Sequence, residues 1–394
     1  MRAGWTILLA ALVAAGCDVG PVRRVPQEPA PPAAVPATPE VPSRHEVRAA
    51  RLPVPPGSVL RQLQFADSRH GYALVAACRA GPASAPAAGP AASAPAGRPE
   101  PGECPAALAA TTDGGLTWQS RQHPRPVATD QQLYVGGAHL VLLHTEPYGW
   151  YVSTDAGQTF AFRAGSSPPP EYAAVAGRYS IWCEPSPCRV VADYLPGGSL
   201  RPLPAQPGLP GDLITVAQAG PHQLWAVSVA HGRAYSAVSL DQGRSWQRRD
   251  PPAPAGAPVR QAELRVSPDG RDVWLLGFGP ADRLEFPRLW LHGPGGWRVR
   301  HAGDPAPVAH AFAAVGGQNL VVAGPGGLGV VGDGYATFGD WPSATGYVRV
   351  LADGTLVAAA DTTGTDTTGA GERLWLGVGQ GTARRWIEII VRTS

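Results

Sequence analysis

The sequence predicts an all-β protein, a single β-propeller whose blades are four-stranded sheets. Three observations lead to this prediction. Short apolar runs alternate with turn residues along most of the chain, a motif of Asp, Gly, hydroxyl and aromatic residues recurs, and its aromatic residues are spaced by about 45 residues or multiples of that interval. An interval of that length matches one four-stranded blade.

Composition sets the outer bounds on the protein. Its 394 residues suit either two ordinary domains or one large all-β domain. The 49 Gly and 44 Pro residues suit many tight turns together with an unstructured linker. All 32 basic residues are Arg, but the formal net charge is only +2. This balance gives no reason to expect a nucleic-acid partner.

The N-terminus predicts export and a lipid anchor. Met1-Arg2 precedes the apolar run Trp5–Ala15, which is too short to span a bilayer and has the length of a signal-peptide core. The run ends in small residues directly before Cys17, a pattern that resembles a bacterial lipobox. We therefore expect residues 1–16 to be a lipoprotein signal peptide and lipidated Cys17 to anchor the protein at the extracytoplasmic face of a bacterial membrane. An ordinary secretory signal followed by a chance Cys is the alternative.

A tether is expected after the anchor. Residues 17–57 begin with Cys17 and are rich in Pro, Ala and Val, so they cannot bury a core and favour extended polyproline II. At about 3.1 Å per residue, such a segment reaches on the order of 100 Å. The folded region is then expected to comprise residues 58–394, with a low-complexity loop insertion at 79–103.

A repeated motif carries the strongest signal in the chain. Its rule is Asp-x-Gly-x-Thr/Ser-aromatic, with one degenerate copy that has lost the Gly. The carboxylate accepts backbone N–H bonds in a tight turn, Gly supplies a positive φ, the hydroxyl closes the turn and the aromatic packs beneath it. The four copies are Asp113, Gly115, Thr117 and Trp118; Asp155, Gly157, Thr159 and Phe160; Asp241, Gly243, Ser245 and Trp246; and Asp333, Thr337 and Phe338.

This motif resembles the Asp-box, or BNR repeat. The resemblance covers the folded region and implies structural β-hairpins in which the Asp residues are staples rather than catalytic acids. Families with such boxes include sialidases, large xyloglucan-cleaving glycosidases, sortilin-type receptors and photosystem II assembly-factor-like propellers.

The aromatic spacing predicts the number of blades. Degenerate hairpins at Trp297 and Trp386 extend the series, and one hairpin without an aromatic is expected near residues 198–200. Six intervals of about 45 residues then separate Trp118 from Trp386, which gives seven blades. Six or eight blades are the alternatives. Closure into a ring would remove exposed sheet edges.

Four cysteines remain beside Cys17, and exported proteins retain disulfides. We expect Cys78 to pair with Cys104 and Cys183 with Cys188, because each pair ends one strand and begins the next, where neighbouring strands lie close together. A zinc site is the competing interpretation, but the gap between Cys78 and Cys104 argues against the close ligand pairs that zinc needs. We expect no metal and no cofactor.

In Asp-box propellers the box turn joins the third and fourth strands of a blade, so the resemblance implies that the turns between second and third strands lie on the opposite face. Long loops and both cysteine pairs gather there, so this face is the predicted binding surface, with ordinary solvated loop tips as the alternative. Its candidate residues are Tyr148, Trp150, Trp182, Glu184, His231, Arg233, Asp282, Arg283 and Phe286.

Two functions remain open at this point. The first is a non-catalytic binding or assembly scaffold, monomeric and membrane-anchored, for an unknown protein or glycan. The opening Phe65-x-Asp67 with Gly71-Tyr72 resembles the assembly-factor-like propellers and favours this function. The alternative is an exo-sialidase-like glycosidase. That family needs an Arg triad, a Tyr/Glu pair, an Asp acid and an early Phe/Tyr-Arg-Ile-Pro segment, whereas residues 58–63 read Ser-Val-Leu-Arg-Gln-Leu.

Overall fold

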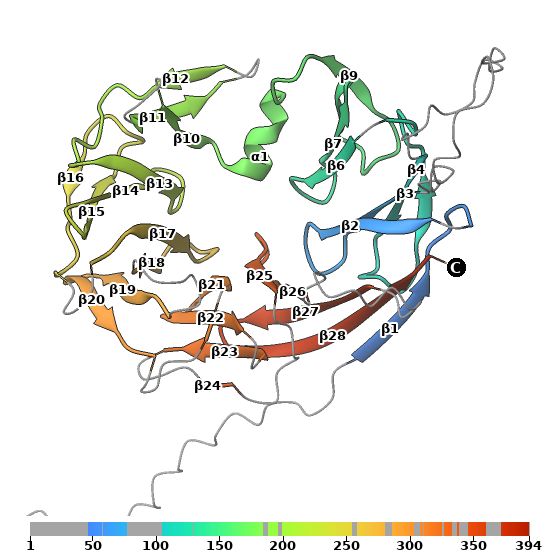
Figure 1. Ribbon diagram of the computed structural model, residues 1–394. Coiled ribbons are helices and arrows are strands. Elements are labelled where there is room, and N and C mark those ends of the chain that lie inside the picture. The colour runs from blue at the N-terminus through green and yellow to red at the C-terminus, as the bar shows by residue number, and fades with distance from the viewer. Residues whose placement is uncertain are drawn as a thin grey trace, which may run out of the picture. The chain divides into compact units, whose positions relative to one another are not determined.

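The computed structural model forms a ring of seven β-sheets (Figure 1). It describes residues 46–393 except 57, 77–104, 129, 184–187, 196–198, 254–257, 280–285, 303–307, 310, 325–326, 333–336, 339–345 and 360–371. The predicted all-β class and the seven blades are confirmed. The predicted signal peptide and Cys17 lie outside the described residues. Among those residues, no helix is both long and apolar enough to cross a membrane.

The blades follow one another along the chain as antiparallel meanders. Blade 1 holds β2 (Val59–Phe65), β3 (Gly71–Ala76), β4 (Ala106–Thr111) and β5 (Gln119–Arg121). Blade 2 holds β6 (Asp130–Val135), β7 (Val141–Glu146), β8 (Gly149–Ser153) and β9 (Ala161–Ala164). Blade 4 holds β13 (Asp212–Gln218), β14 (Leu224–Ala230), β15 (Arg233–Ser239) and β16 (Gln247–Arg248).

The remaining four-stranded blades close the ring. Blade 5 holds β17 (Gln261–Val266), β18 (Val273–Phe278), β19 (Arg288–Gly293) and β20 (Gly296–Arg300). Blade 6 holds β21 (Ala311–Gly316), β22 (Asn319–Gly324), β23 (Gly327–Val331) and β24 (Thr337–Phe338). Blade 7 holds β25 (Tyr347–Val350), β26 (Leu356–Ala359), β27 (Glu372–Gln380) and β28 (Ala383–Arg392).

Blade 3 departs from the predicted four strands. In the part of this blade that the structure describes, the strands are β10 (Tyr179–Cys183), β11 (Cys188–Tyr194) and β12 (Leu200–Pro202). The 3-10 helix η1 (Pro170–Tyr172) and the short helix α1 (Ala173–Ala176) occupy the place in the chain where a first strand would stand. Three consecutive prolines precede this Ala-rich segment, and Pro is favoured at the first turn of a helix.

A further strand extends blade 7. β1 (Glu46–Arg51) pairs with β28 in parallel and becomes the fifth strand of that sheet. The linker predicted for residues 17–57 therefore ends earlier than expected. Polar and apolar residues alternate from Glu46 to Ala49, which suits a strand, but this pattern is short and lies among prolines.

Hydrophobic clusters of buried residues fill the seams between neighbouring blades. The second strands supply much of this packing because both of their faces are covered. In β14, Trp225 and Val227 face blade 5, whereas the alternate residues Leu224 and Ala226 face blade 3. This period-2 alternation lets one strand contribute to two seams.

The seam between blades 2 and 3 is built differently. Trp150 and Val152 of blade 2 pack there with Tyr172 and Val175 of the helical segment, rather than with a facing sheet. Figure 1 shows α1 between the two blades. The helical segment thus takes the place of the missing strand as a packing partner.

Candidate functional site

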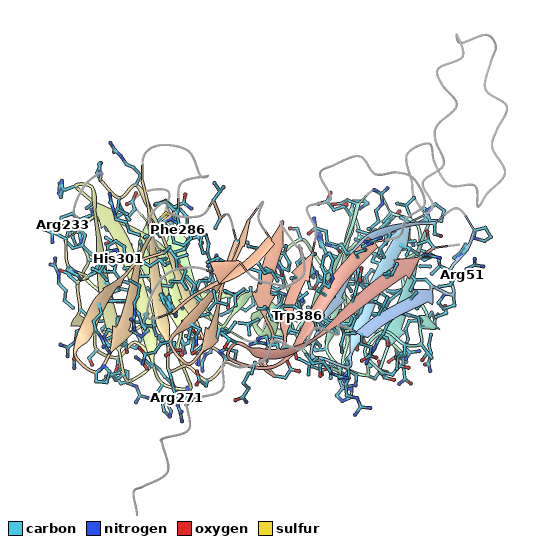
Figure 2. All side chains as sticks on the ribbon, turned by 90° about the horizontal axis from the view of Figure 1, so that it is seen from below. Arg51, Arg233, Arg271, Phe286, His301 and Trp386 are labelled. Carbon is cyan, nitrogen blue, oxygen red and sulfur yellow. A yellow bond between two sulfur atoms is a disulfide. The ribbon has the colours of Figure 1, made fainter. Side chains whose placement is uncertain are left out.

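The antiparallel meander gives the ring two distinct faces. Turns between strands 1 and 2 and between strands 3 and 4 lie on one side, which we call the box face. Turns between strands 2 and 3 and the connections between blades lie on the other side, which we call the loop face. Figure 2 shows Arg233 and Phe286 toward one side of the ring and Arg271, from a 1–2 turn, toward the opposite side.

Three box turns on the box face have the same hydrogen-bond pattern. In blade 2, Asp155 Oδ1 accepts the Thr159 backbone N–H at 2.9 Å, and Asp155 Oδ2 accepts the Thr159 hydroxyl at 2.6 Å. Asp241 makes the equivalent bonds with Ser245, and Asp113 makes them with Thr117. The degenerate fourth copy has Asp333 outside the described residues.

A hydroxyl two residues before each Asp completes the turn, although it lies outside the motif Asp-x-Gly-x-Thr/Ser-aromatic. Ser153 Oγ donates to Asp155 Oδ1 at 2.7 Å and accepts the Gly157 N–H at 2.8 Å. Thr111 and Ser239 hold the same positions in blades 1 and 4. All three hydroxyl residues are buried. A Ser or Thr at this position in every good copy was the available signal.

These contacts fix the charge of the box carboxylates. The Thr159 hydroxyl and backbone N–H lower the pKa of Asp155 to about 2, and Ser245 does the same to the pKa of Asp241. Hydrogen bonds that favour the ionised form have this effect. A carboxylate held ionised by donors of its own turn staples the hairpin and has no proton to give as a general acid.

The box aromatics pack into the seam with the preceding blade. Trp118 belongs to the cluster shared by blades 7 and 1, and Phe160 packs against the cluster shared by blades 1 and 2. Trp246 lies between blades 3 and 4, where its Nε1–H donates to the Ala205 carbonyl at 3.0 Å. Trp297 and Trp386, predicted as aromatics of degenerate hairpins, occupy the equivalent seams before blades 5 and 7.

The box glycines differ in the space around them, and this difference can be tested. Gly243 (φ +81°) and Gly157 (φ +77°) both have left-handed backbone, which costs an L-residue about 1–2 kcal/mol. A Cβ at Gly243 would lie 2.3 Å from Leu203 Cδ1, whereas at Gly157 the nearest atom is 3.5 Å away. We expect Gly243→Ala to destabilise the protein by about 1–3 kcal/mol more than Gly157→Ala, because overpacking adds to the backbone cost.

Urea unfolding of both glycine variants measures this difference. Gly157→Ala is the matched control, because it changes the same motif position without the clash. Equal losses in the two variants would show that the Leu203 contact carries no cost.

Those predicted loop-face residues that the structure describes do not form one cluster of exposed side chains. His231 and Arg233 are exposed in the 2–3 turn of blade 4, and Trp182 is half-buried near the end of β10. Phe286 packs against Phe312 with ring centroids 5.9 Å apart. Glu184, Asp282 and Arg283 lie outside the described residues.

The assignment of Trp150 to the binding face is wrong. Its side chain is only 4% exposed and its ring packs with Tyr134, His144 and Tyr172. Trp150 is the second residue of β8, so close to the turn that the sequence does not show which way its side chain points. In the structure, strand alternation directs this side chain into the blade 2/3 seam.

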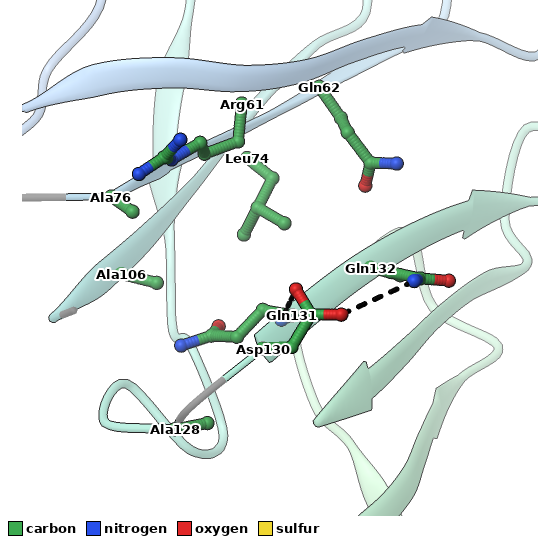
Figure 3. Close-up of a pocket in the computed structure, with 9 residues that line it drawn as sticks. All are labelled: Arg61, Gln62, Leu74, Ala76, Ala106, Ala128, Asp130, Gln131 and Gln132. Carbon is green, nitrogen blue, oxygen red and sulfur yellow. Dashed lines mark hydrogen bonds between the residues drawn. The ribbon is translucent and has the colours of Figure 1, made fainter. Parts of the chain in front are cut away.

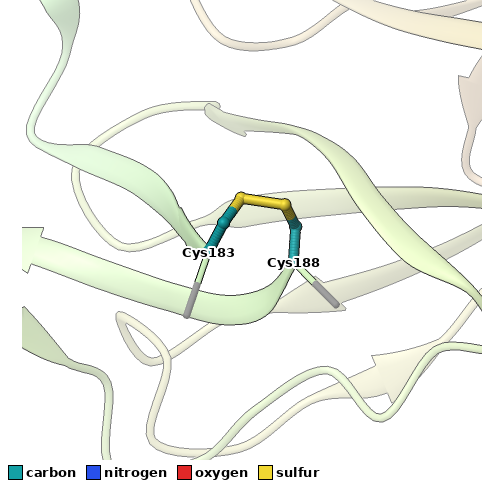
Figure 4. Close-up of a disulfide and its surroundings, with 2 residues drawn as sticks. All are labelled: Cys183 and Cys188. Atoms are coloured by element: carbon teal, nitrogen blue, oxygen red, sulfur yellow. A yellow bond between two sulfur atoms is a disulfide. The ribbon is translucent and has the colours of Figure 1, made fainter. Parts of the chain in front are cut away.

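The predicted Cys183–Cys188 disulfide is present (Figure 4). It joins the end of β10 to the start of β11, and the two Cα atoms are 4.1 Å apart. It therefore closes the 2–3 turn of blade 3 on the loop face. Cys78 and Cys104 lie outside the described residues.

A pocket of about 380 Å³ lies at the loop-face end of the blade 1/2 seam (Figure 3). Blade 1 contributes Arg61 and Gln62 from the start of β2, and blade 2 contributes Asp130, Gln131 and Gln132 from the start of β6. The remaining lining residues are apolar: Leu74, Ala76, Ala106 and Ala128. This site could not be predicted from the sequence, because its residues come from two blades and form no motif.

Local contacts hold the polar lining in place. Asp130 Oδ1 accepts the Gln131 N–H at 2.8 Å, and Asp130 Oδ2 accepts from Gln132 Nε2 at 3.4 Å. Gln62 Oε1 accepts the Leu133 N–H across the seam. The seam between the inner strands of blades 1 and 2 is thus bridged directly at the pocket.

Tyr148, one of the predicted binding residues, lies beside the chain segment that connects blade 1 to blade 2 and supplies Ala128 to the pocket wall. The Arg125 guanidinium stacks over the Tyr148 ring at 3.7 Å, which joins the blade 1–2 connection to the 2–3 turn of blade 2. The neighbouring Pro126 carbonyl accepts from the N–H of Ala106, a lining residue. Burial lowers the pKa of His123, in the same connection, to about 4, so this imidazole is neutral near pH 7.

The site has no cluster that suggests a metal. Among the described residues, no group of three or more His, Cys, Asp and Glu side chains could hold a metal ion. What the arrangement offers chemically is hydrogen bonding: a guanidinium, a carboxylate and side-chain amides around an apolar floor.

The fold and the box turns define the class of the protein as a β-propeller with Asp-stapled hairpins. No family model and no curated protein matches the chain. Solved structures similar to it include YCF48 bound to D1 peptide, at 16% identity and a TM-score of 0.30 over 86% of this chain and 82% of that one. YCF48 from Cyanidioschyzon merolae matches at 12% identity and a TM-score of 0.39 over 82% of this chain and 94% of that one.

A glycosidase is also among the similar structures. The GH74 xyloglucanase from Xanthomonas campestris is 13% identical with a TM-score of 0.32, and the match covers 80% of this chain and 58% of that one. At these identities and TM-scores, the likeness to the three structures supports no conclusion about what this protein does.

Proposed function

We propose that the protein is a membrane-anchored, extracytoplasmic scaffold that holds a protein or glycan partner on its loop face without catalysis. The single observation that supports this most is the pocket at the blade 1/2 seam. Binding sites are typically concave, with an apolar lining and a few fixed polar groups. Arg61, Asp130 and the Gln side chains provide both donors and acceptors for the polar chain of a partner.

The box face is the less suitable surface for this role. Its three well-formed carboxylates already accept hydrogen bonds from hydroxyl and N–H groups of their own turns. A partner that recruited these carboxylates would have to break bonds that hold the hairpins. We therefore place the partner on the loop face.

The binding proposal is tested by capture from native membranes with the lipidated protein. The variants Asp130→Ala and Gln131→Ala alter the pocket, whereas Arg271→Ala alters an exposed side chain on the box face. Truncation of a binding hot spot costs at least about 2 kcal/mol, so we expect recovery of the specific partner to fall more than tenfold with the pocket variants and to stay unchanged with Arg271→Ala. Melting curves verify that each variant is folded.

Two outcomes would contradict the binding proposal. Capture that survives both pocket variants and is lost with Arg271→Ala would move the partner to the box face. Robust turnover of a fluorogenic sialoside would replace the scaffold with an enzyme.

The anchor is tested separately. Cys17→Ser removes the residue that we propose to be lipidated, so the protein should move from the membrane fraction to the soluble fraction. Retention of Cys17→Ser in the membrane fraction after salt and carbonate washes would contradict the lipid anchor while leaving the scaffold proposal standing.

A further inference from the structure

The strand β1 lies at the junction between the last blade and the first. Blade 7 already has four strands of its own, so β1 is not needed to complete it. β1 pairs with the outer strand β28 over its whole length, from Glu46 opposite Ile387 to Arg51 opposite Arg392. The chain then continues directly into blade 1, where β2 begins at Val59.

One side chain of β1 reaches across to blade 1. The Arg48 guanidinium donates through Nη1 to the carbonyls of Asp113, at 2.9 Å, and Gly114, at 2.7 Å, in the first box turn. Glu46 positions this guanidinium by accepting from Arg48 Nε at 2.7 Å, and it also pairs with Arg385 of β28 at 3.1 Å. The Arg48 side chain is only 10% exposed, so its bonds to the turn are shielded from water.

The residues after β1 are packed into the same junction. The Leu52 N–H donates to the Arg392 carbonyl at 2.9 Å, and its side chain is 3% exposed in the cluster shared by blades 7 and 1. Ala50 and Val54 pack against this cluster. The opposite side of β1 is open, with Val47 54% exposed.

These contacts belong to one seam. Ladder bonds attach β1 to blade 7, Arg48 attaches it to blade 1, and Leu52 fills the core between the two blades. Arg349 adds an inner contact at the same seam, where its guanidinium donates to the Phe65 carbonyl at 2.9 Å. The seam is thus bridged from the inside by Arg349 and from the outside by β1.

We propose that β1 is a clasp that holds the ring closed at the blade 7/1 seam. β1 is the first element of the described part of the chain, so a load applied to Glu46 from its N-terminal side reaches this strand before any other. Release of the clasp opens the blade 7/1 seam while the other seams keep their packing.

Hydrogen exchange measured by mass spectrometry on the full chain tests the clasp. Arg48→Ala removes the bonds to the first box turn, and Leu52→Ala weakens the packing independently. Arg51→Ala is the matched control, because Arg51 ends the same strand with an exposed side chain. Peptides covering 111–118 and 383–392 report on the seam, and peptides covering 224–239 in blade 4 serve as an internal reference.

We expect Arg48→Ala and Leu52→Ala each to speed exchange at least tenfold in the two seam peptides, with less than a twofold change in blade 4. Arg51→Ala should change none of them. Equal acceleration in all peptides would mean that β1 stabilises the whole ring and is no clasp. Unchanged exchange in the seam peptides of both variants would also overturn the proposal.

Discussion

Replacement of Trp225 by Ala is expected to lower the free energy of unfolding by about 3–5 kcal/mol, the range typical of Trp or Phe truncation in a core. Trp225 is fully buried in β14, and its ring lies 4.6 Å from His292 and 5.2 Å from Trp297 of blade 5. Truncation would leave a cavity in the blade 4/5 seam, which rigid sheets on both sides cannot collapse to fill.

Urea unfolding followed by fluorescence and circular dichroism measures this loss. Phe162→Ala is the control, because Phe162 is 50% exposed on the outer strand β9. Phe162→Ala should cost less than about 1 kcal/mol, since half of the Phe162 surface is already in water and the side chain fills no seam. A loss in Trp225→Ala no larger than that in Phe162→Ala would show that the seam does not hold the ring.

Replacement of Arg384 by Ala is expected to lower the free energy of unfolding by about 2–4 kcal/mol, because charged hydrogen bonds to three backbone carbonyls are lost. Arg384 is 4% exposed at the start of β28. Its Nη1 donates to the Gly354 carbonyl at 2.7 Å and to the Gly377 carbonyl at 2.8 Å, and its Nε donates to Gly381. Burial lowers the pKa of Arg384 to about 10, so desolvation offsets part of the gain from these bonds.

Arg385→Ala is a control at the adjacent position. Arg385 has a 59% exposed side chain paired with Glu46, and an exposed ion pair contributes at most about 1 kcal/mol. Both variants remove an Arg side chain, at positions one residue apart. The difference between their free energies of unfolding therefore measures what the buried position of Arg384 contributes. A difference below about 1 kcal/mol would mean that the carbonyls of blade 7 find other donors.

Much of the ring could be predicted because its signal repeats. Trp118, Phe160, Trp246, Trp297 and Trp386 mark hairpins at multiples of one interval, and strand period 2 locates the buried runs. The motif of Asp, Gly and a hydroxyl residue also predicted the hydrogen bonds from the hydroxyl residue to the Asp carboxylate within each box turn. The same regularity explains why the Cys183–Cys188 pairing could be read from the sequence.

The strand β1 and the helical segment of blade 3 were not predicted, because neither follows the regular spacing of the blades. The strand β1 stands among prolines that favour extended linker, and only its pairing with β28 about 340 residues later makes it part of a sheet. The segment from Pro170 to Ala176 has no strand alternation, yet a first strand was expected there by analogy with the other blades. Such features depend on contacts between distant residues that no local pattern carries.

The candidate site was predicted less well than the fold. Turn topology placed Tyr148, His231 and Arg233 on the loop face, but it could not tell which side chains point outward, so Trp150 was assigned wrongly. The pocket itself is formed by Arg61 and Asp130 from different blades. Their proximity is a consequence of ring geometry, and neither residue belongs to a motif.

The box turns and their aromatics have separable roles, and this affects how such a chain can change over time. The hydrogen bonds of each staple lie within seven residues, from Ser153 to Thr159 in the second copy, so their loss acts first on the hairpin that contains them. Trp297 and Trp386 have no Asp-box around them, yet they still fill their seams. Mutation can therefore remove the hydrogen bonds of one box turn and leave the ring intact. Loss of an aromatic residue that packs between two blades, in contrast, weakens both blades.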